Sequence, residues 1–395
     1  MSTFSDRSPP RIGVIGTGFI ARHFVKELRR RPDYRLAKVL TRRDVNQCGD
    51  FPSQEALVND LGALIEKSDI VFECTGDPLY AASTLGEVLD AGIPVVTLNA
   101  EFHATVGSFF AHRGTLSEAD GDQPGCLASL YEDAVEMGFS PRVCANMKAF
   151  LNLDPSPEEM AHWAAKQNYS LEMVTSFTDG TKLQIEQCLV ANGLGLDIAK
   201  RGLVGLREPD LQVAAQQLGR IAESHGAPIS DFILDRSVHH GVFIVARHDD
   251  YQCTALRNYK MGEGPYYLLM KDYCLCHLEV FKTIDRVLRT GRPLLNNGSS
   301  PQIGVASIAK RDLRVGEFIA RGAGSFALRG ECVRIQEEPD HLPICLANEV
   351  RIRRPVERGE VLTLHHVDID ETPALRAWLA IRDSKVGAAV AVSNG

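Results

Sequence analysis

The chain has 395 residues, of which 44% are hydrophobic and 24% charged, and its formal net charge is −8 at pH 7. These values are typical of a globular chain of two or three domains, and the negative charge argues against general binding to nucleic acid. The sequence has no apolar run near the roughly 18–20 residues of a membrane helix, and its polar start lacks the apolar core of a signal peptide, so we expect a cytoplasmic protein with no membrane partner.

The first predicted unit is a strand, a glycine turn and a helix. The apolar run Ile12–Ile15 ends at Gly16, and Gly16, Gly18 and Ala21 take the small positions of G-x-G-x-x-G/A ahead of a helix at Phe19–Arg30. In this motif the glycines permit a tight turn and close approach to a pyrophosphate, which the helix N-terminus binds. A glycine-rich turn that binds nothing is the alternative. The predicted cofactor contacts here are Gly16, Gly18, Phe19 and Ile20.

The next predicted strand, Leu36–Leu40, ends in a hydroxyl and two guanidinium groups, those of Thr41, Arg42 and Arg43. An acid at this tip would hold the ribose 2′-hydroxyl of NAD. Arginine side chains match a phosphate instead, so the tip favours NADP. Asp44 follows closely and keeps NAD as the less favoured cofactor, and a solvated basic loop is the alternative interpretation.

Two further predicted strands, Asp69–Cys74 and Ile93–Leu98, end at polar turns. Thr75 and Gly76 follow the first and Asn99 follows the second, and such tips face the cofactor in doubly wound sheets. Covering helices are predicted at Gln54–Glu66, Leu79–Ala91 and Leu127–Met137. The alternation predicts an α/β fold with a Rossmann-type doubly wound parallel sheet, in a cofactor domain of residues 1–150.

The loop Asp120–Gly125 combines acids, an amide and turn residues. It has the composition of a polar β-turn. It could equally hold a polyhydroxylated substrate or a divalent ion such as Mg²⁺ or Mn²⁺, although the metal ligands stay unknown. We assign Asp120, Asp122 and Gln123 to substrate binding. Lys148, after a predicted strand at Pro141–Met147, is a candidate for proton transfer or for a substrate phosphate.

The segment Ser176–Lys182 leads into a predicted helix at Leu183–Asn192. Lys182 and Glu186 are four residues apart and can interact on one helical face. Such a pair is commonly a surface ion pair. In a cofactor enzyme, a buried lysine could instead polarise a carbonyl or carry its proton, with the carboxylate holding it. We predict Lys182 and Glu186 as catalytic, Lys148 as the second proton-transfer candidate, and Asn192 as a weaker substrate contact.

The remaining chain divides into a central region and a β-rich end. Predicted elements are a helix at Pro157–Gln167, strands at Gly241–Arg247 and Thr254–Arg257, a helix at Glu279–Arg289 and a strand at Val305–Ile308. A linker rich in glycine, asparagine and serine separates the last two. We therefore predict a central catalytic and dimerisation region at 151–300 and a small β-rich domain at 301–395.

Several motifs together resemble a known family. DGDQPG, SFTDGTK, GEGPYY, AKRDLRVGE and LPICLANEVRIRRPVERGEVLT resemble proteins described as predicted homoserine dehydrogenases with a C-terminal SAF domain, a β-clip fold. One branch of that family is the DXR-like, or type II, 1-deoxy-D-xylulose 5-phosphate reductoisomerase of isoprenoid biosynthesis. The resemblance implies NADPH, a homodimer, and a small polar substrate such as a sugar phosphate.

The leading hypothesis is therefore an NADP(H)-dependent oxidoreductase acting on a hydroxy or keto group of a small molecule. VVTLNAE resembles VVTANK of homoserine dehydrogenases, but Ala100 and Glu101 replace its lysine, which leaves a homoserine dehydrogenase-like enzyme as an alternative. A second alternative is a non-catalytic dinucleotide-binding sensor or assembly protein. A reductoisomerase would use a divalent metal, whereas a simple dehydrogenase needs none.

Overall fold

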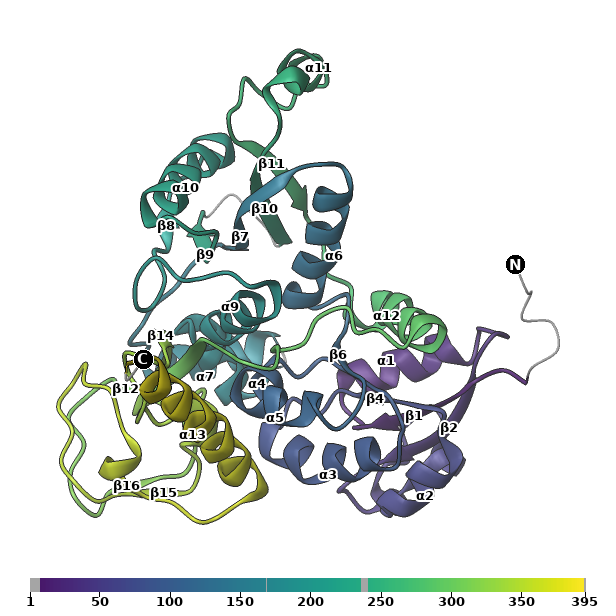
Figure 1. Cartoon of the computed structure of the whole chain (residues 1–395). Coiled ribbons are helices and arrows are strands. Elements are labelled where there is room, and N and C mark those ends of the chain that lie inside the picture. Colours follow the sequence, from purple (N-terminus) through teal and green to yellow (C-terminus); the bar gives the residue numbers. More distant parts are fainter. Residues whose placement is uncertain (1–7, 168, 236–240, 394–395) are drawn as a thin grey trace.

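The computed structural model describes residues 8–167, 169–235 and 241–393. In Figure 1 the N-terminal α/β unit, the central sheet and the C-terminal module occupy three regions around helix α9 (Thr181–Leu194). Among the described residues, no helix is long and apolar enough to cross a membrane.

The N-terminal unit is a parallel sheet with strand order β3-β2-β1-β4-β5-β6, which confirms the predicted doubly wound fold. Its strands are β1 (Arg11–Ile15), β2 (Arg35–Leu40), β3 (Leu57–Val58), β4 (Ile70–Glu73), β5 (Val95–Thr97) and β6 (Leu116–Glu118). Its helices are α1 (Phe19–Leu28), α2 (Leu61–Lys67), α3 (Pro78–Asp90), α4 (Ala100–Phe102) and α5 (Ser108–Ala111), with a π-helical turn at His103–Gly107.

Helix α1 forms where its apolar residues recur on one face. Phe24, Val25 and Leu28 are buried, and the Phe24 ring lies 4.6 Å from that of Phe72 on β4. Helix α12 (Cys276–Thr290) returns from much later in the chain to cover the other side of Phe24, with Phe281 stacked 4.8 Å away. The cofactor unit is therefore completed by a distant segment.

A mixed sheet of order β11-β10-β7-β9-β8 forms the central region. Helix α10 covers one face of it, while α6 and α9 lie against the other. Its elements are α6 (Gln123–Glu136), β7 (Ser140–Lys148), α7 (Pro157–Gln167), α8 (Leu171–Thr178), β8 (Leu206–Arg207), α10 (Leu211–His225), β9 (Ile229–Leu234), β10 (Gly241–Arg247), α11 (Cys253–Asn258) and β11 (Tyr267–Lys271).

Some sequence predictions of local structure are wrong. The segment 54–66 is not one helix, because Leu57 pairs with Val39 at the sheet edge and Asp60 then caps α2. Residues 254–257 belong to helix α11 rather than to a strand. Strand β7 was expected in the first sheet, but it pairs with β9 and β10 of the second. These outcomes depend on strand pairing, which local periodicity does not encode.

The C-terminal module contains small antiparallel sheets, and helix α13 is its last element. Its elements are β12 (Ile303–Ala309), β13 (Phe318–Ile319), β14 (Leu328–Arg334), β15 (Val350–Ile352), β16 (Val367–Asp368) and α13 (Pro373–Ser393). Single 3₁₀ turns lie at Val45–Gln47, Gln54–Ala56, Asp250–Gln252, Ile344–Leu346 and Leu364–His366.

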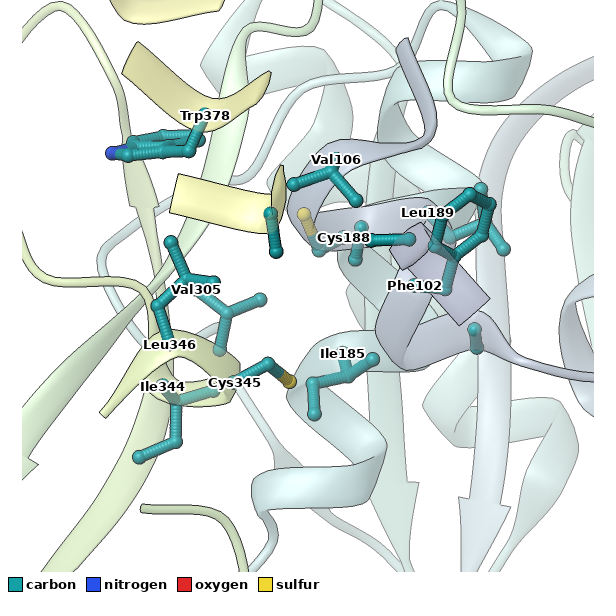
Figure 2. Packing of buried hydrophobic residues seen from close by; sticks show 14 of the residues in the cluster. Phe102, Val106, Ile185, Cys188, Leu189, Val305, Ile344, Cys345, Leu346 and Trp378 are labelled. Carbon is teal, nitrogen blue, oxygen red and sulfur yellow. The ribbon is translucent and has the colours of Figure 1, made fainter. Parts of the chain in front are cut away.

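The module shares a hydrophobic core with the cofactor unit. Figure 2 shows Val305, Leu346 and Trp378 of the module facing the segment of Phe102 and Val106, with Leu189 of α9 in the same cluster. Because all of these side chains are buried in one core, helix α9 packs against both the C-terminal module and the cofactor unit. This packing fixes the helix that carries Lys182.

Candidate active site

The glycine turn after β1 leaves an open cradle at the start of α1. Gly16 has φ +121°, and a Cβ there would lie 3.3 Å from the Cys74 carbonyl oxygen. A Cβ on Gly18 would meet nothing within 4 Å, and no side chain caps the helix. The uncapped N–H groups and the open space fit the pyrophosphate of a dinucleotide.

The tip of β2 is built by two threonines and an arginine. Thr41 is buried, with its hydroxyl 3.2 Å from that of Thr17. Arg43 Nη2 donates to the Thr17 carbonyl at 3.1 Å and to its hydroxyl at 2.8 Å. Arg43 therefore stabilises the glycine turn through its hydrogen bonds to Thr17.

Arg42 lies closer to the cofactor cradle. Its guanidinium donates to Asp77 at 2.8 Å and lies over the Tyr80 ring, 4.4 Å from the centroid. The nearby acid Asp44 is used locally, because its side chain accepts hydrogen bonds from the backbone and amide nitrogens of Asn46. The tip thus presents arginine rather than a free carboxylate.

The tips of β4 and β5 are joined by a buried acid that the sequence analysis did not single out. Glu73 accepts hydrogen bonds from Thr75 N at 2.7 Å and from the Thr97 hydroxyl at 2.6 Å. Burial raises the pKa of Glu73, and these hydrogen bonds act against the rise. On the next tip, Asn99 accepts from Phe102 N at 3.0 Å and begins α4. The predicted contacts Thr75, Gly76 and Asn99 therefore lie on ordered turns.

A cleft of about 540 Å³ runs from the glycine turn to the C-terminal module. Its residues from the cofactor unit and α6 are Gly18, Phe19, Ile20, Arg42, Cys74, Thr75, Gly76, Asp77, Pro78, Leu98, Glu101 and Asp122. The opposite wall consists of Ser170, Glu172, Met173, Ser176, Phe177, Lys182, Cys276, Arg321, Ala323, Cys345 and Asn348. Three parts of the chain therefore meet around one cavity.

Lys182 projects into this cleft from the first turn of α9. Its Nζ lies 2.9 Å from Glu101 Oε2 and 4.0 Å from Asp122 Oδ2. Burial acts to lower the pKa of Lys182, but the charges of Glu101, Asp122 and Glu186 outweigh it and the pKa lies well above its ordinary value. The side chain is an ammonium held between carboxylates.

Glu186 forms a second pair one turn further along α9. Asn146 Nδ2 donates to Glu186 Oε2 at 2.8 Å, and Lys148 Nζ lies 3.9 Å from the same oxygen. Burial raises the pKa of Glu186 to about 7, although the charges of Lys148 and Lys182 act to lower it. The ion pair formed by Lys182 thus involves Glu101, while Glu186 binds Asn146 and lies beside Lys148.

Asp120 lies behind the cleft wall in a buried charge network. Lys271 Nζ is 3.1 Å from Asp120 Oδ1, 2.5 Å from Glu279 Oε1 and 3.1 Å from Cys126 Sγ. Two carboxylates and a thiol within 4.8 Å could suggest a metal site. The ammonium groups of Lys271 and Lys282 already balance the two carboxylates, and a thiol is a poor ligand for Mg²⁺, so these donors fit an ion-pair network better than a magnesium site.

Gln123 and Asn192 lie in different surroundings. Gln123 is buried at the start of α6, next to Asp122. Asn192 donates to the Ile303 carbonyl at 2.9 Å and accepts from the Gln302 and Ile303 amides at 2.8 and 2.9 Å. Asn192 therefore ties the linker to α9.

The structure brings together in one cleft most of the predicted cofactor contacts and two of the predicted chemical groups, Lys182 and Asp122. Five other predicted site residues do not line the cleft: Lys148, Glu186, Asp120, Gln123 and Asn192. The role of Glu101 as a partner of Lys182 was missed, although its place after a strand tip was a usable signal. Arg321 and Asn348 had no local signal, because only the folded module brings them to the cleft.

Comparisons with known proteins assign two parts of the chain. Residues 16–110 match the family model for the NAD-binding domain of homoserine dehydrogenase, and residues 121–280 match the model for the catalytic domain of oxidoreductase DRL. A search of curated proteins finds no match.

Solved structures with similar folds include three dehydrogenases. A probable dehydrogenase from Thermotoga maritima is 14% identical with a TM-score of 0.41, over 72% of this chain and 90% of that one. D-galactose-1-dehydrogenase from Rhizobium etli is 12% identical with a TM-score of 0.43, over 76% and 94%. A homoserine dehydrogenase from Thiobacillus denitrificans is 16% identical with a TM-score of 0.38, over 46% and 48%.

Proposed function

Because the chain is an NAD(P)-dependent oxidoreductase, we propose that it uses NADP(H) to interconvert a carbonyl and a hydroxyl group on a small polar substrate. The observation that carries this proposal is the Lys182 ammonium, held 2.9 Å from Glu101 in the cleft that also contains the glycine turn. A non-catalytic sensor is not retained, since the family match covers a catalytic domain as well as a cofactor domain.

In the proposed reaction, Lys182 acts on the substrate oxygen. Its Nζ donates a hydrogen bond to that oxygen, stabilises the negative charge that develops there and supplies the proton of the new hydroxyl group. Glu101 holds the ammonium in place, and Asp122 binds a substrate hydroxyl. The nicotinamide dinucleotide, when bound, supplies or accepts the hydride. Lys148 and Glu186 form the second proton-transfer pair.

A sugar phosphate is the substrate class that we favour, as in a DXP reductoisomerase of isoprenoid biosynthesis. Arg321 lines the cleft from the C-terminal module, and its charge helps to lower the pKa of Glu172, which lines the same cleft. Its guanidinium is the kind of group that binds a phosphate. We assign this module to the SAF type, with a role in closing the cleft over the substrate.

NADP is the proposed form of the cofactor. Arg42 lies at the cleft beside its ion-pair partner Asp77 and carries a guanidinium that can bind a 2′-phosphate, while Asp44, the acid that follows this strand tip in the chain, is engaged with Asn46. A carboxylate that already accepts two local hydrogen bonds is poorly placed to bind the ribose diol of NAD.

A homoserine dehydrogenase-like reaction on an amino-acid semialdehyde is the second candidate. The match of residues 16–110 to the homoserine dehydrogenase cofactor domain favours it. Ala100 and Glu101 stand where the motif of those enzymes has a lysine, so Lys182 would have to supply the cation.

The test is a screen of NADPH oxidation against small keto-sugars, their phosphates and amino-acid semialdehydes, run with Mg²⁺, with Mn²⁺ and with a strong chelator. Turnover of a keto-sugar phosphate that stops in the chelator supports the reductoisomerase-like reaction. Full activity in the chelator rules that reaction out, and turnover of semialdehydes alone supports the second candidate.

We also propose that the enzyme is a homodimer, and light scattering at catalytic concentration measures this directly. A monomer at that concentration would refute the dimer.

A further inference from the structure

Helix α8 presents an exposed apolar surface to the cleft. Its N-cap Ser170 and the residues Met173, Ser176 and Phe177 all line the cleft. Their spacing of three or four positions places them on one face of the helix. Met173 is 44% exposed and Phe177 is 39% exposed. Two large apolar side chains are therefore open to solvent inside the cleft that also contains the glycine turn.

The other face of α8 already has its packing partners. Val174 is buried in one cluster with Met160 of α7, and Phe326 of the C-terminal module packs against that cluster. A helix of a globular protein usually buries one apolar face and exposes polar residues on the other. The apolar residues on the cleft face are thus not needed to hold α8, and exposed apolar surface of this kind marks a binding site.

Contacts at both ends hold α8 in position. A Cβ on Gly324 would lie 2.2 Å from the backbone oxygen of Glu172, so the C-terminal module and the start of α8 are in close backbone contact. At the other end, Asn152 N donates a hydrogen bond to the Thr178 carbonyl at 2.8 Å. The apolar wall is therefore formed before any ligand binds, as is usual in ligand sites.

The chain path places the last turn of α8 next to the candidate reaction centre. Phe177 lies in that turn and Lys182 in the first turn of α9, with only Asp179 and Gly180 between the two helices. Hydride transfer requires the nicotinamide to lie against the carbon whose oxygen contacts Lys182. The nicotinamide end of the cofactor, rather than its adenine end, is therefore the part that reaches Phe177.

The cofactor unit supplies apolar groups to the same cleft. Ile20 lies in the first turn of α1, and Cys74 and Leu98 directly follow β4 and β5. A flat ring held between two apolar walls is removed from water on both faces, and an aromatic neighbour adds to the gain from buried area. Tyr169 supports the Phe177 ring, because the two rings meet edge-on with centroids 6.2 Å apart.

We propose that Phe177 and Met173 are cofactor-binding residues, which cover the nicotinamide ring of the bound dinucleotide from the side opposite the glycine turn and hold it beside Lys182. The inference rests on the proposed function, because the role of Lys182 identifies the reaction end of the cleft. Helix α8 takes no part in proton or hydride transfer. Its contribution is to bind the ring and to keep water from it.

The decisive measurement compares a whole dinucleotide with a fragment that lacks the nicotinamide. NADPH is paired with 2′-phospho-ADP-ribose and NADH with ADP-ribose, so the comparison holds for either form of the cofactor. In isothermal titration calorimetry, Phe177→Ala should bind the whole dinucleotide about tenfold more weakly and the fragment with unchanged affinity. Equal losses for the dinucleotide and its fragment, or no loss for either, would overturn the inference.

Fluorescence of the reduced nicotinamide gives a second readout without turnover. Bound NADPH should emit more strongly and at shorter wavelength in the wild type, and Phe177→Ala should lose most of this change. Phe177→Leu should keep it, because leucine retains an apolar cover. The matched control is Trp163→Ala, since Trp163 of α7 is 37% exposed but does not line the cleft.

Equal emission from the wild type and Phe177→Ala, or an equal loss in Trp163→Ala, would also overturn the inference. Thermal unfolding shows whether each variant is folded. Failure of the proposed function would appear differently, as an absence of turnover in the substrate screen while Phe177→Ala still separates the dinucleotide from its fragment.

Discussion

The buried ion pair between Lys310 and Asp179 should contribute strongly to the attachment of the C-terminal module. Lys310 Nζ, at the end of β12, lies 2.6 Å from Asp179 Oδ2, two residues before α9, and the side chains are only 1% and 0% exposed. Asp179 also accepts from Thr181 N at 2.8 Å, in the first turn of that helix. Replacing the lysine by methionine would leave a buried carboxylate without its cation.

The expected magnitude follows from the burial. Removing one partner of a buried pair costs about 3–5 kcal/mol, whereas an exposed pair contributes about 0–1 kcal/mol. Lys310→Met should therefore lower the free energy of unfolding by about 3–5 kcal/mol. The matched control is Arg358→Met, because Arg358 pairs with Asp154 at 3.0 Å and these side chains are 67% and 52% exposed. That variant should lose at most about 1 kcal/mol.

Equilibrium urea unfolding followed by circular dichroism measures both variants. The double variant Asp179→Asn with Lys310→Met should recover much of the loss, since it removes the uncompensated charge as well. Equal losses in Lys310→Met and Arg358→Met would refute the argument that this pair is held in a low-dielectric core.

Three further outcomes are expected. In the wild type, kcat/KM should rise as the pH increases through about 7, because the buried Glu186 ionises and can then hold Lys148. Glu186→Gln should remove this rise from the pH profile of kcat/KM. The same rise in the variant would contradict the prediction. Arg42→Gln should weaken NADPH binding about tenfold, or about 1.4 kcal/mol, and leave the affinity for NADH nearly unchanged, as measured by fluorescence titration. Equal losses of affinity for both cofactors would count against a 2′-phosphate contact. Gly125→Ala should destabilise the protein by about 1–3 kcal/mol or more in thermal unfolding, because its Cβ would sit 1.8 Å from the Ala119 carbonyl oxygen; an unchanged melting temperature would argue against this close approach.

Local sequence patterns were sufficient to predict the Rossmann-type fold of the cofactor unit, but not its edge strand β3 or the covering helix α12. The Gly16 turn, the helix after it and the buried strands are each specified within a short window of residues, and the parallel sheet follows from their alternation. The same reasoning placed Lys182 directly before a predicted helix at Leu183–Asn192. Helix α9 instead runs from Thr181 to Leu194, so Lys182 lies in its first turn and Gly195 is its C-cap.

The partners of the polar side chains could not be predicted in this way. The spacing of Lys182 and Glu186 indicated an i, i+4 pair, yet the carboxylate nearest to Lys182 is Glu101, which is 81 positions away in the chain. Asp120 was assigned to substrate binding, but it is buried and its carboxylate lies 3.1 Å from Lys271 of β11. Such contacts depend on how the elements assemble in space, which periodicity does not reveal.

The central claim is that Lys182 acts on the substrate oxygen during hydride transfer. Its most direct test is a single-turnover experiment with NADPH deuterated at nicotinamide C4 and the best substrate of the screen, on wild type, Lys182→Met and the surface control Lys67→Met. The account predicts deuterium in the product from wild type and Lys67→Met, and a rate at least about 10²-fold lower in Lys182→Met with NADPH affinity retained. Equal single-turnover rates in wild type and Lys182→Met would contradict it.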